Sequence, residues 1–129
     1  MGIDIYAKWA SQSESDRGKQ AAAWLSVDDG DVGYLREAYH GAPYATRVLV
    51  PEAFDVATYP DGAPISAATL RKRLRKTLSV ARARQLLVYK EPAGSVDTRM
   101  VLQSFTDFVV FCEAKERETG TPCRIYASF

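Results

Sequence analysis

A chain of 129 residues, of which 47% are hydrophobic and 26% charged, is typical of one globular domain spanning 1–129 and excludes the disordered and fibrous classes. The formal net charge of +1 argues against a protein dedicated to nucleic-acid binding. Because the sequence shows no signal peptide and no apolar run of the ~20 residues that cross a bilayer, we expect a cytoplasmic protein without a membrane partner.

Both ends of the chain alternate between apolar and polar residues, with the period of a half-buried strand. The apolar positions are Ile3, Ile5, Ala7 and Trp9 near the start, and Cys123, Ile125, Ala127 and Phe129 near the end. We predict strands over residues 2–8 and 123–128 that share one sheet, with their odd-numbered residues packed under helices.

The segments that follow the first strand are harder to assign. Ser11–Gln20 is polar and lacks apolar periodicity, so we expect a loop or hairpin connection there, and Ala21–Val27 is a candidate second strand. Asp28–Asp31 combines a turn signal with a candidate helix N-cap. Residues 32–40 fit a short helix through the spacing of their apolar positions, or a short strand, and Gly41 and Pro43 end them.

The middle of the chain reads as extended and irregular. Thr46, Val48 and Val50 favour extended structure, and the proline that follows Val50 disfavours a helical conformation at that residue. Pro51–Phe54 is consistent with one helical turn that has proline at its first position. Residues 55–64 are predicted to form a surface connection.

Two long amphipathic helices are predicted in the C-terminal half, over 66–90 and 97–119. Ser66 is the N-cap of the first, and Ser95 or Asp97 of the second, which Gly120 and Pro122 end. Their apolar faces comprise Leu70, Leu74, Leu78, Ala81 and Val88 in the first helix, and Val101, Leu102, Phe105, Phe108, Val109 and Cys112 in the second. Since Met100, Val110 and Phe111 lie outside that second face, we expect the second helix to be buried on more than one side.

These elements predict an α+β fold, with a small sheet that includes both terminal strands packed against two long C-terminal helices. Two cysteines, Cys112 and Cys123, are too few for a disulfide framework or a zinc site. We expect them to be free thiols, because helix and sheet layers lie roughly 10 Å apart, beyond the ~7 Å Cα separation that a bridge tolerates. No motif for a metal or a cofactor is present, so we predict neither.

Charge is concentrated in residues 62–90, which carry eight Lys and Arg and no Asp or Glu. A helix so rich in cations repels itself, so an anionic partner would stabilise it. The candidate partner- or anion-binding residues are Arg71, Lys72, Arg75, Lys76 and Arg82, with Arg73 and Arg84 also on the helix surface. The alternative interpretation is a solvated face whose charges pair with the acidic N-terminal half of the chain.

Residues 33–46 contain the densest cluster of polar aromatic residues. His40, which is the one histidine in the sequence, could act as a general base oriented by Glu37 if the two stand three residues apart on a helix. A structural histidine near a helix end is the alternative. Tyr34, Arg36, Tyr39 and Tyr44 form a secondary candidate surface.

The opening MGIDIY, the block GYLREAYHG and the following PYAT resemble a group of small uncharacterised proteins from bacteria and their phages, over most of the chain. The resemblance implies a bacterial or phage origin and carries no catalytic residue. It also implies a phage or prophage protein that acts on a host component, such as a defence complex. By analogy, this favours a binding role.

Our functional hypothesis is a non-enzymatic binding module that engages a protein or nucleic-acid partner, with the basic helix as its surface. A protein is the expected partner, nucleic acid through residues 70–90 is the alternative, and homo-oligomerisation is left open. A small enzyme that uses His40 as its base is the rival hypothesis from another class.

Overall fold

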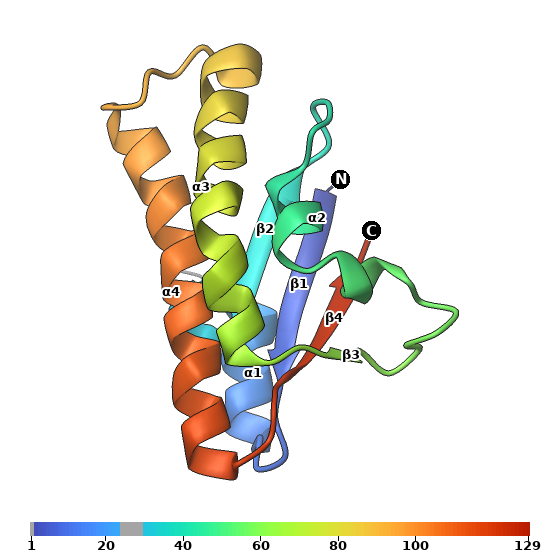
Figure 1. Cartoon of the computed structure of the whole chain (residues 1–129). Coiled ribbons are helices and arrows are strands. Elements are labelled where there is room, and N and C mark those ends of the chain that lie inside the picture. Colours follow the sequence, from blue (N-terminus) through green and yellow to red (C-terminus); the bar gives the residue numbers. More distant parts are fainter. Residues whose placement is uncertain (1, 24–29) are drawn as a thin grey trace.

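The computed structural model describes residues 2–23 and 30–129 and has an α+β architecture. A four-stranded antiparallel sheet in the order β2-β1-β4-β3 is packed against two long C-terminal helices (Figure 1). The strands are β1 (Gly2–Lys8), β2 (Tyr34–Ala38), β3 (Ala63–Pro64) and β4 (Arg124–Ser128). The two ends of the chain therefore form the central pair of strands, and the predicted fold class is confirmed.

The alternation at the chain ends places one apolar face of the sheet under the helices. Ile3 and Ile5 of β1 are fully buried, Ile5 pairs with Leu35 of β2 and with Ala127 of β4, and Ile125 is buried beside them. This confirms the prediction for the odd-numbered residues. Phe129, the last predicted apolar position, is the exception, because it is 54% exposed and lies beyond the end of β4. Its ring packs against that of the half-buried Phe54.

The two long helices are α3 (Ala67–Tyr89) and α4 (Val96–Thr119). Each begins at a serine whose side chain accepts a hydrogen bond from the backbone N–H three residues later: Ser66 from Thr69, and Ser95 from Thr98. Helix α4 ends at Gly120, which adopts the left-handed conformation with φ 76°. Local sequence signals therefore determine where these helices begin and where α4 ends.

Helix α4 is less enclosed than the sequence suggested. Met100 and Val110, which were expected to be buried on additional sides, are 37% and 47% exposed. Phe111 is half-buried, with its ring 5.2 Å from that of Trp9. The expectation of burial on more than one side is therefore wrong for Met100 and Val110, because no described element covers that side of α4.

The predicted loop at Ser11–Gln20 is wrong, because helix α1 (Glu14–Ala22) lies there. Ser13 and Asp16 form a capping box, in which the Ser13 hydroxyl accepts from the Asp16 N–H and the Asp16 carboxylate accepts from the Ser13 N–H. The helix has no apolar stripe because it lies on the surface and buries chiefly Gln20, whose amide donates to Ala7 O at 2.6 Å.

The candidate second strand at Ala21–Val27 is also wrong for its first residues, because Ala21 and Ala22 form the end of α1. Residues 24–27 of this segment lie outside the described residues. The candidate N-cap at Asp28 and Asp29 lies outside them too. A 3-10 turn, η2 (Gly30–Val32), follows, and the ambiguous segment 32–40 forms strand β2 over Tyr34–Ala38 rather than a helix.

The extended structure expected at Thr46, Val48 and Val50 is wrong. A short helix, α2 (Ala45–Leu49), forms there, and a 3-10 turn, η3 (Pro51–Phe54), follows it as predicted. The side chain of the N-cap residue, Tyr44, forms no capping hydrogen bond with α2. Instead the carboxylate of Glu37, on β2, accepts hydrogen bonds from the first two N–H groups of the helix, so a residue on a neighbouring strand stabilises α2 despite its β-branched residues.

Candidate functional site

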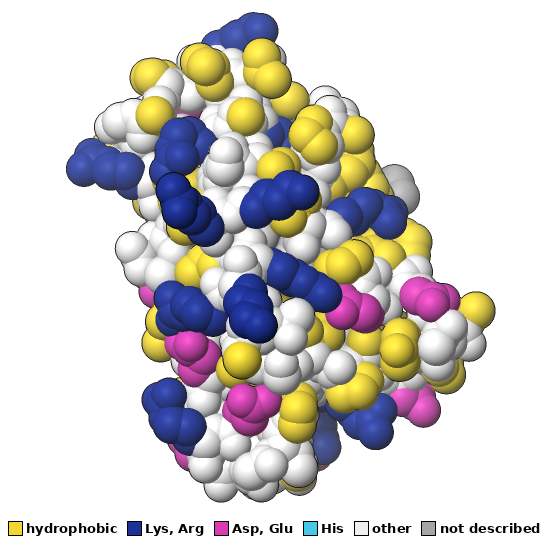
Figure 2. All heavy atoms as spheres, viewed as in Figure 1, with side chains coloured by type: hydrophobic (Ala, Val, Ile, Leu, Met, Phe, Trp, Pro, Cys, Tyr) yellow, Lys and Arg dark blue, Asp and Glu magenta, His cyan; other side chains and the backbone are white. Residues whose placement is uncertain are grey.

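The solvent-facing side of α3 carries four cations that no described residue neutralises. At 100° per residue, Lys72, Arg75, Lys76 and Arg82 fall within an arc of about 120°, together with Ser79, Ala83 and Leu86. All four cations are exposed, and none forms an ion pair with residues 2–23 or 30–129. Figure 2 shows the Lys and Arg side chains gathered over α3 and the adjacent part of α4. We call this surface the α3 face.

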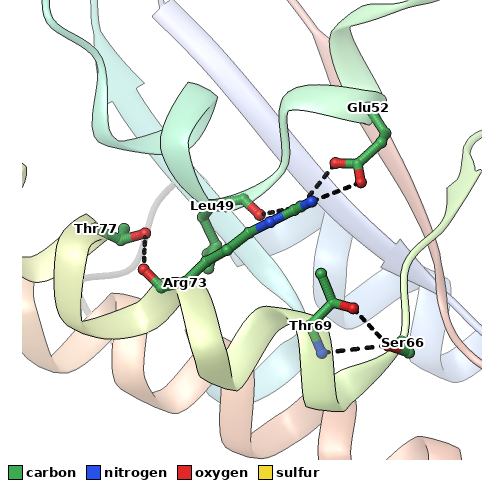
Figure 3. Close-up of polar contacts among 6 residues, drawn as sticks. All are labelled: Leu49, Glu52, Ser66, Thr69, Arg73 and Thr77. Atoms are coloured by element: carbon green, nitrogen blue, oxygen red, sulfur yellow. Dashed lines mark hydrogen bonds and ion pairs between the residues drawn. The ribbon is translucent and has the colours of Figure 1, made fainter.

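The other three basic residues of the helix, Arg71, Arg73 and Arg84, form ion pairs. Arg71, a predicted anion-binding residue, binds Glu113 of α4 with two hydrogen bonds of 3.0 and 2.5 Å. Arg73 binds Glu52 with bonds of 2.7 and 2.8 Å and also donates to Leu49 O, so it anchors α3 to α2 and η3 (Figure 3). Pairing with the acidic N-terminal half thus occurs between Arg73 and Glu52 and between Arg84 and Glu37, away from the α3 face.

Replacing Arg73 by methionine should destabilise the protein at neutral pH, and the loss should shrink in acid. Hydrogen bonding to Arg73 holds the pKa of Glu52 below its usual value. The stability that this adds is present above the unfolded-state pKa of ~4.3 and is lost as the pH falls through the lower folded-state pKa. Denaturant unfolding of both proteins at neutral pH and below about pH 3 measures the difference. Equal losses at both pH values would contradict the prediction; Arg71→Met, at the more exposed pair, should lose less.

The α3 face continues into two exposed leucines at the C-terminal end of the helix. Leu86 is 55% exposed and Leu87 66% exposed, and hydrophobic side chains gather at this end in the upper part of Figure 2. Our sequence reasoning missed them as functional candidates. Their exposure could have been predicted from the sequence, because helical spacing places both leucines outside the apolar stripe that Leu70, Leu74 and Val88 define.

Glu37, the predicted orienting carboxylate, is buried and fully engaged. It accepts hydrogen bonds from Ala45 N (2.8 Å), Thr46 N (3.0 Å) and Thr46 Oγ1 (2.5 Å), and Arg84 Nη1 lies 3.2 Å from its Oε2. The sequence left helix and strand open for this segment, and the condition that would place Glu37 and His40 on one helix is not met, since Glu37 lies on β2. The partners of Glu37 are backbone, threonine and arginine groups. This geometry is that of a structural carboxylate.

Arg84 was placed on the helix surface by the sequence, and the structure corrects this. Its side chain is 5% exposed and crosses from α3 to β2 and the loop that follows, where it donates to Gly41 O at 3.0 Å and to Ala38 O. The guanidinium also lies 4.8 Å from the ring centre of Tyr44. Arg84 therefore belongs to the packing of the loop and not to the α3 face.

His40 lies on the exposed loop after β2. Its Nδ1 is 2.9 Å from the hydroxyl of Tyr89, at the end of α3, and the two rings meet edge to face. Neither Glu37 nor any other carboxylate of the described residues pairs with it. This arrangement joins the loop to the helix end, as expected for the structural alternative.

The secondary candidate surface divides into two pairs. Tyr34 and Arg36 both contact Asp4 of β1. Burial, and after it the hydrogen bond to Asp4, raises the pKa of Tyr34 well above its usual value. Tyr39 and Tyr44 lie in and after the loop, edge to face at 5.8 Å. The four residues do not form one continuous surface through their described contacts.

Both cysteines are buried free thiols, as predicted. Cys123 immediately precedes β4, and its thiol interacts directly with that of Cys112 on α4. This hydrogen bond, together with burial, raises the pKa of Cys112 well above its usual value. The two thiols are therefore neighbours in the buried core of the protein.

Within residues 2–23 and 30–129, no group of three or more His, Cys, Asp or Glu is positioned to hold a metal ion. Among the same residues no helix combines the length and the apolarity needed to traverse a bilayer. Comparison with models of protein families, with curated proteins and with solved structures yields no match for this chain.

Proposed function

We propose that this protein is a non-enzymatic binding module whose α3 face binds an acidic, partly apolar segment of a partner protein. The observation that carries the proposal is the combination on one helix side of four unpaired cations with the exposed Leu86 and Leu87. The other basic residues of α3 are satisfied internally, so within this helix the unpaired positive charge is confined to the α3 face.

The two parts of the α3 face have different physical roles. Clustered cations attract an acidic partner over a distance and orient it, which chiefly affects the association rate. Burial of Leu86 and Leu87 would supply affinity, since removing exposed apolar surface from water is favourable. A charged row beside a small apolar patch matches the usual organisation of an interface, with a polar rim around an apolar core.

The resemblance to small bacterial and phage proteins directs the search for the partner, and on it we propose a host protein, such as part of a defence complex. A cytoplasmic location belongs to the same proposal, because two buried free cysteines suit a reducing compartment. The enzyme hypothesis has less support, since Glu37 is fully occupied by Thr46, Ala45 and Arg84.

Reversing two charges on the α3 face should abolish capture of the partner. We expect the tagged protein to retain a specific protein from nuclease-treated bacterial lysate, and the variant Arg75→Glu/Lys76→Glu to lose it. Leu86→Ser/Leu87→Ser should weaken capture at least tenfold, as expected for the loss of apolar anchors. Both variants should unfold within about 0.5 kcal/mol of the wild type, because the four side chains are exposed.

The matched control is Arg17→Glu/Lys19→Glu, which makes the same charge change at two exposed, unpaired residues of α1. This control should capture the partner as the wild type does. Retention of the same protein by both α3 variants would show that α3 is not the binding surface.

A nucleic acid is the second candidate partner, favoured by the length of the cationic row. From Lys72 to Arg82 the row spans about 15 Å at 1.5 Å per residue, which faces four or five phosphates at ~3.4 Å per phosphate of one strand. Four contacts would give log affinity a slope near −3.6 against log salt on duplex DNA. The leucine variant separates the candidates, since phosphate binding needs only the cations and should survive Leu86→Ser/Leu87→Ser.

A further inference from the structure

A cavity of about 450 Å³ lies where α3 and α4 pass beside β2, away from the α3 face. Ala81, Val101 and Phe105 contribute apolar walls, and an adjoining hollow of about 270 Å³ shares Val101 and Phe105 with it. This volume lies within the range of sites that hold small organic molecules, which are typically apolar with a few placed polar groups. The cavity therefore has the size and the lining of a ligand site.

Gln85 is the polar group that this lining leaves unused. Gln85 is 8% exposed and lines the cavity. No described residue forms a hydrogen bond with its side-chain amide. Gln20, which is equally buried, makes three amide hydrogen bonds. Among the described residues, every fully buried side-chain nitrogen or oxygen has a hydrogen-bond partner. Because the side-chain amide of Gln85 has none, it is not fully buried, and we infer that it faces the cavity. An amide held there offers a donor and an acceptor to whatever occupies the cavity.

The unpaired charge around the cavity is negative. Arg36 and Arg84 lie in its walls, but Asp4 and Glu37 already neutralise them. Glu91 and Asp97 also line it, and neither residue forms an ion pair within the described part of the chain. A cationic or neutral ligand is thus favoured over an anion.

We propose that this cavity binds a small organic cation with an apolar ring and an amide-like hydrogen-bonding edge. The ring would pack on Val101 and Phe105, the edge would pair with the Gln85 amide, and the positive group would lie by Glu91 and Asp97. Buried, directional pairing with Gln85 would give specificity, while the carboxylates at the walls select the sign of charge. The site is independent of the α3 face, which selects anions.

Phenylalaninamide carries all three features and is the probe for the test, with phenylacetate as the anionic control. In a two-dimensional NMR titration of the full chain, phenylalaninamide should shift the amide signals around Gln85, Val101 and Phe105, and phenylacetate should not. Gln85→Met, which keeps the length of the side chain, should raise the Kd about tenfold, as expected for one lost hydrogen bond. Shifts confined to other surfaces, or equal binding of phenylacetate, would overturn the proposal.

A second variant protects the test against misfolding at position 85. Glu91→Gln/Asp97→Asn changes groups nearer the solvent and should also weaken phenylalaninamide binding, by a factor that falls as salt is added. The α3-face variant Arg75→Glu/Lys76→Glu should bind phenylalaninamide like the wild type. Unchanged affinity in both cavity variants would refute the site.

Discussion

Replacing Arg84 by methionine is expected to lower the free energy of unfolding by about 3–5 kcal/mol, the range for removing one partner of a buried ion pair. The substitution leaves the Glu37 carboxylate, which is 7% exposed, without its cation. It also leaves the carbonyl of Gly41 without the donor that α3 provides. Denaturant unfolding followed by circular dichroism measures the loss.

The control for this prediction is Arg82→Met, two residues earlier on the exposed side of α3, which should change stability by about 0.5 kcal/mol or less. The double variant Glu37→Gln/Arg84→Met should be less destabilised than the sum of the single variants, because it removes both charges together. If Arg84→Met unfolds like Arg82→Met, the buried pair does not hold the loop after β2.

Replacing Gly30 by alanine is expected to destabilise the protein by about 3 kcal/mol, the upper part of the usual range for overpacking. Gly30 lies in η2 against α4, where an added Cβ would stand 2.2 Å from Ser104 O and 3.0 Å from Phe108 N. Both are backbone atoms of a helix, so they cannot move aside as a flexible side chain would. Either η2 or α4 must shift.

Gly18→Ala is the matched control and should have the opposite sign. Gly18 lies inside α1, and an added Cβ there meets nothing within 4 Å. Alanine should therefore stabilise the helix by about 0.5–1 kcal/mol through its higher helix propensity. Thermal unfolding of both variants tests the pair, and a similar change in Tm for the two would contradict the close approach of η2 to α4.

Much of the candidate site could be located from the sequence but not resolved in detail. The concentration of cations in residues 62–90 pointed to α3, and helical spacing alone could place Lys72, Arg75, Lys76 and Arg82 on one side. It could not show that Arg71 pairs with Glu113, 42 residues later in the chain, or that the exposed end at Leu86 continues the same surface. These facts depend on which elements pack beside α3.

The sequence by itself determined the elements whose signals are local. Alternation defined both terminal strands, and a serine before an apolar stripe defined the starts of α3 and α4, because such patterns act within one or two turns of the chain. Helix α1 belongs to this class as well. Its capping box at Ser13 and Asp16 was readable, although its surface position removed the apolar period that we relied on.

Only the tertiary structure decided the remaining features, because their partners are distant in sequence. Helix α2 forms at β-branched residues because Glu37, on a strand, accepts its first N–H groups. Arg84 becomes a buried residue because Glu37 and the loop carbonyls provide acceptors that no local pattern announces. The free amide of Gln85 likewise depends on where α4 and β2 leave space, which is a property of packing and not of any single segment.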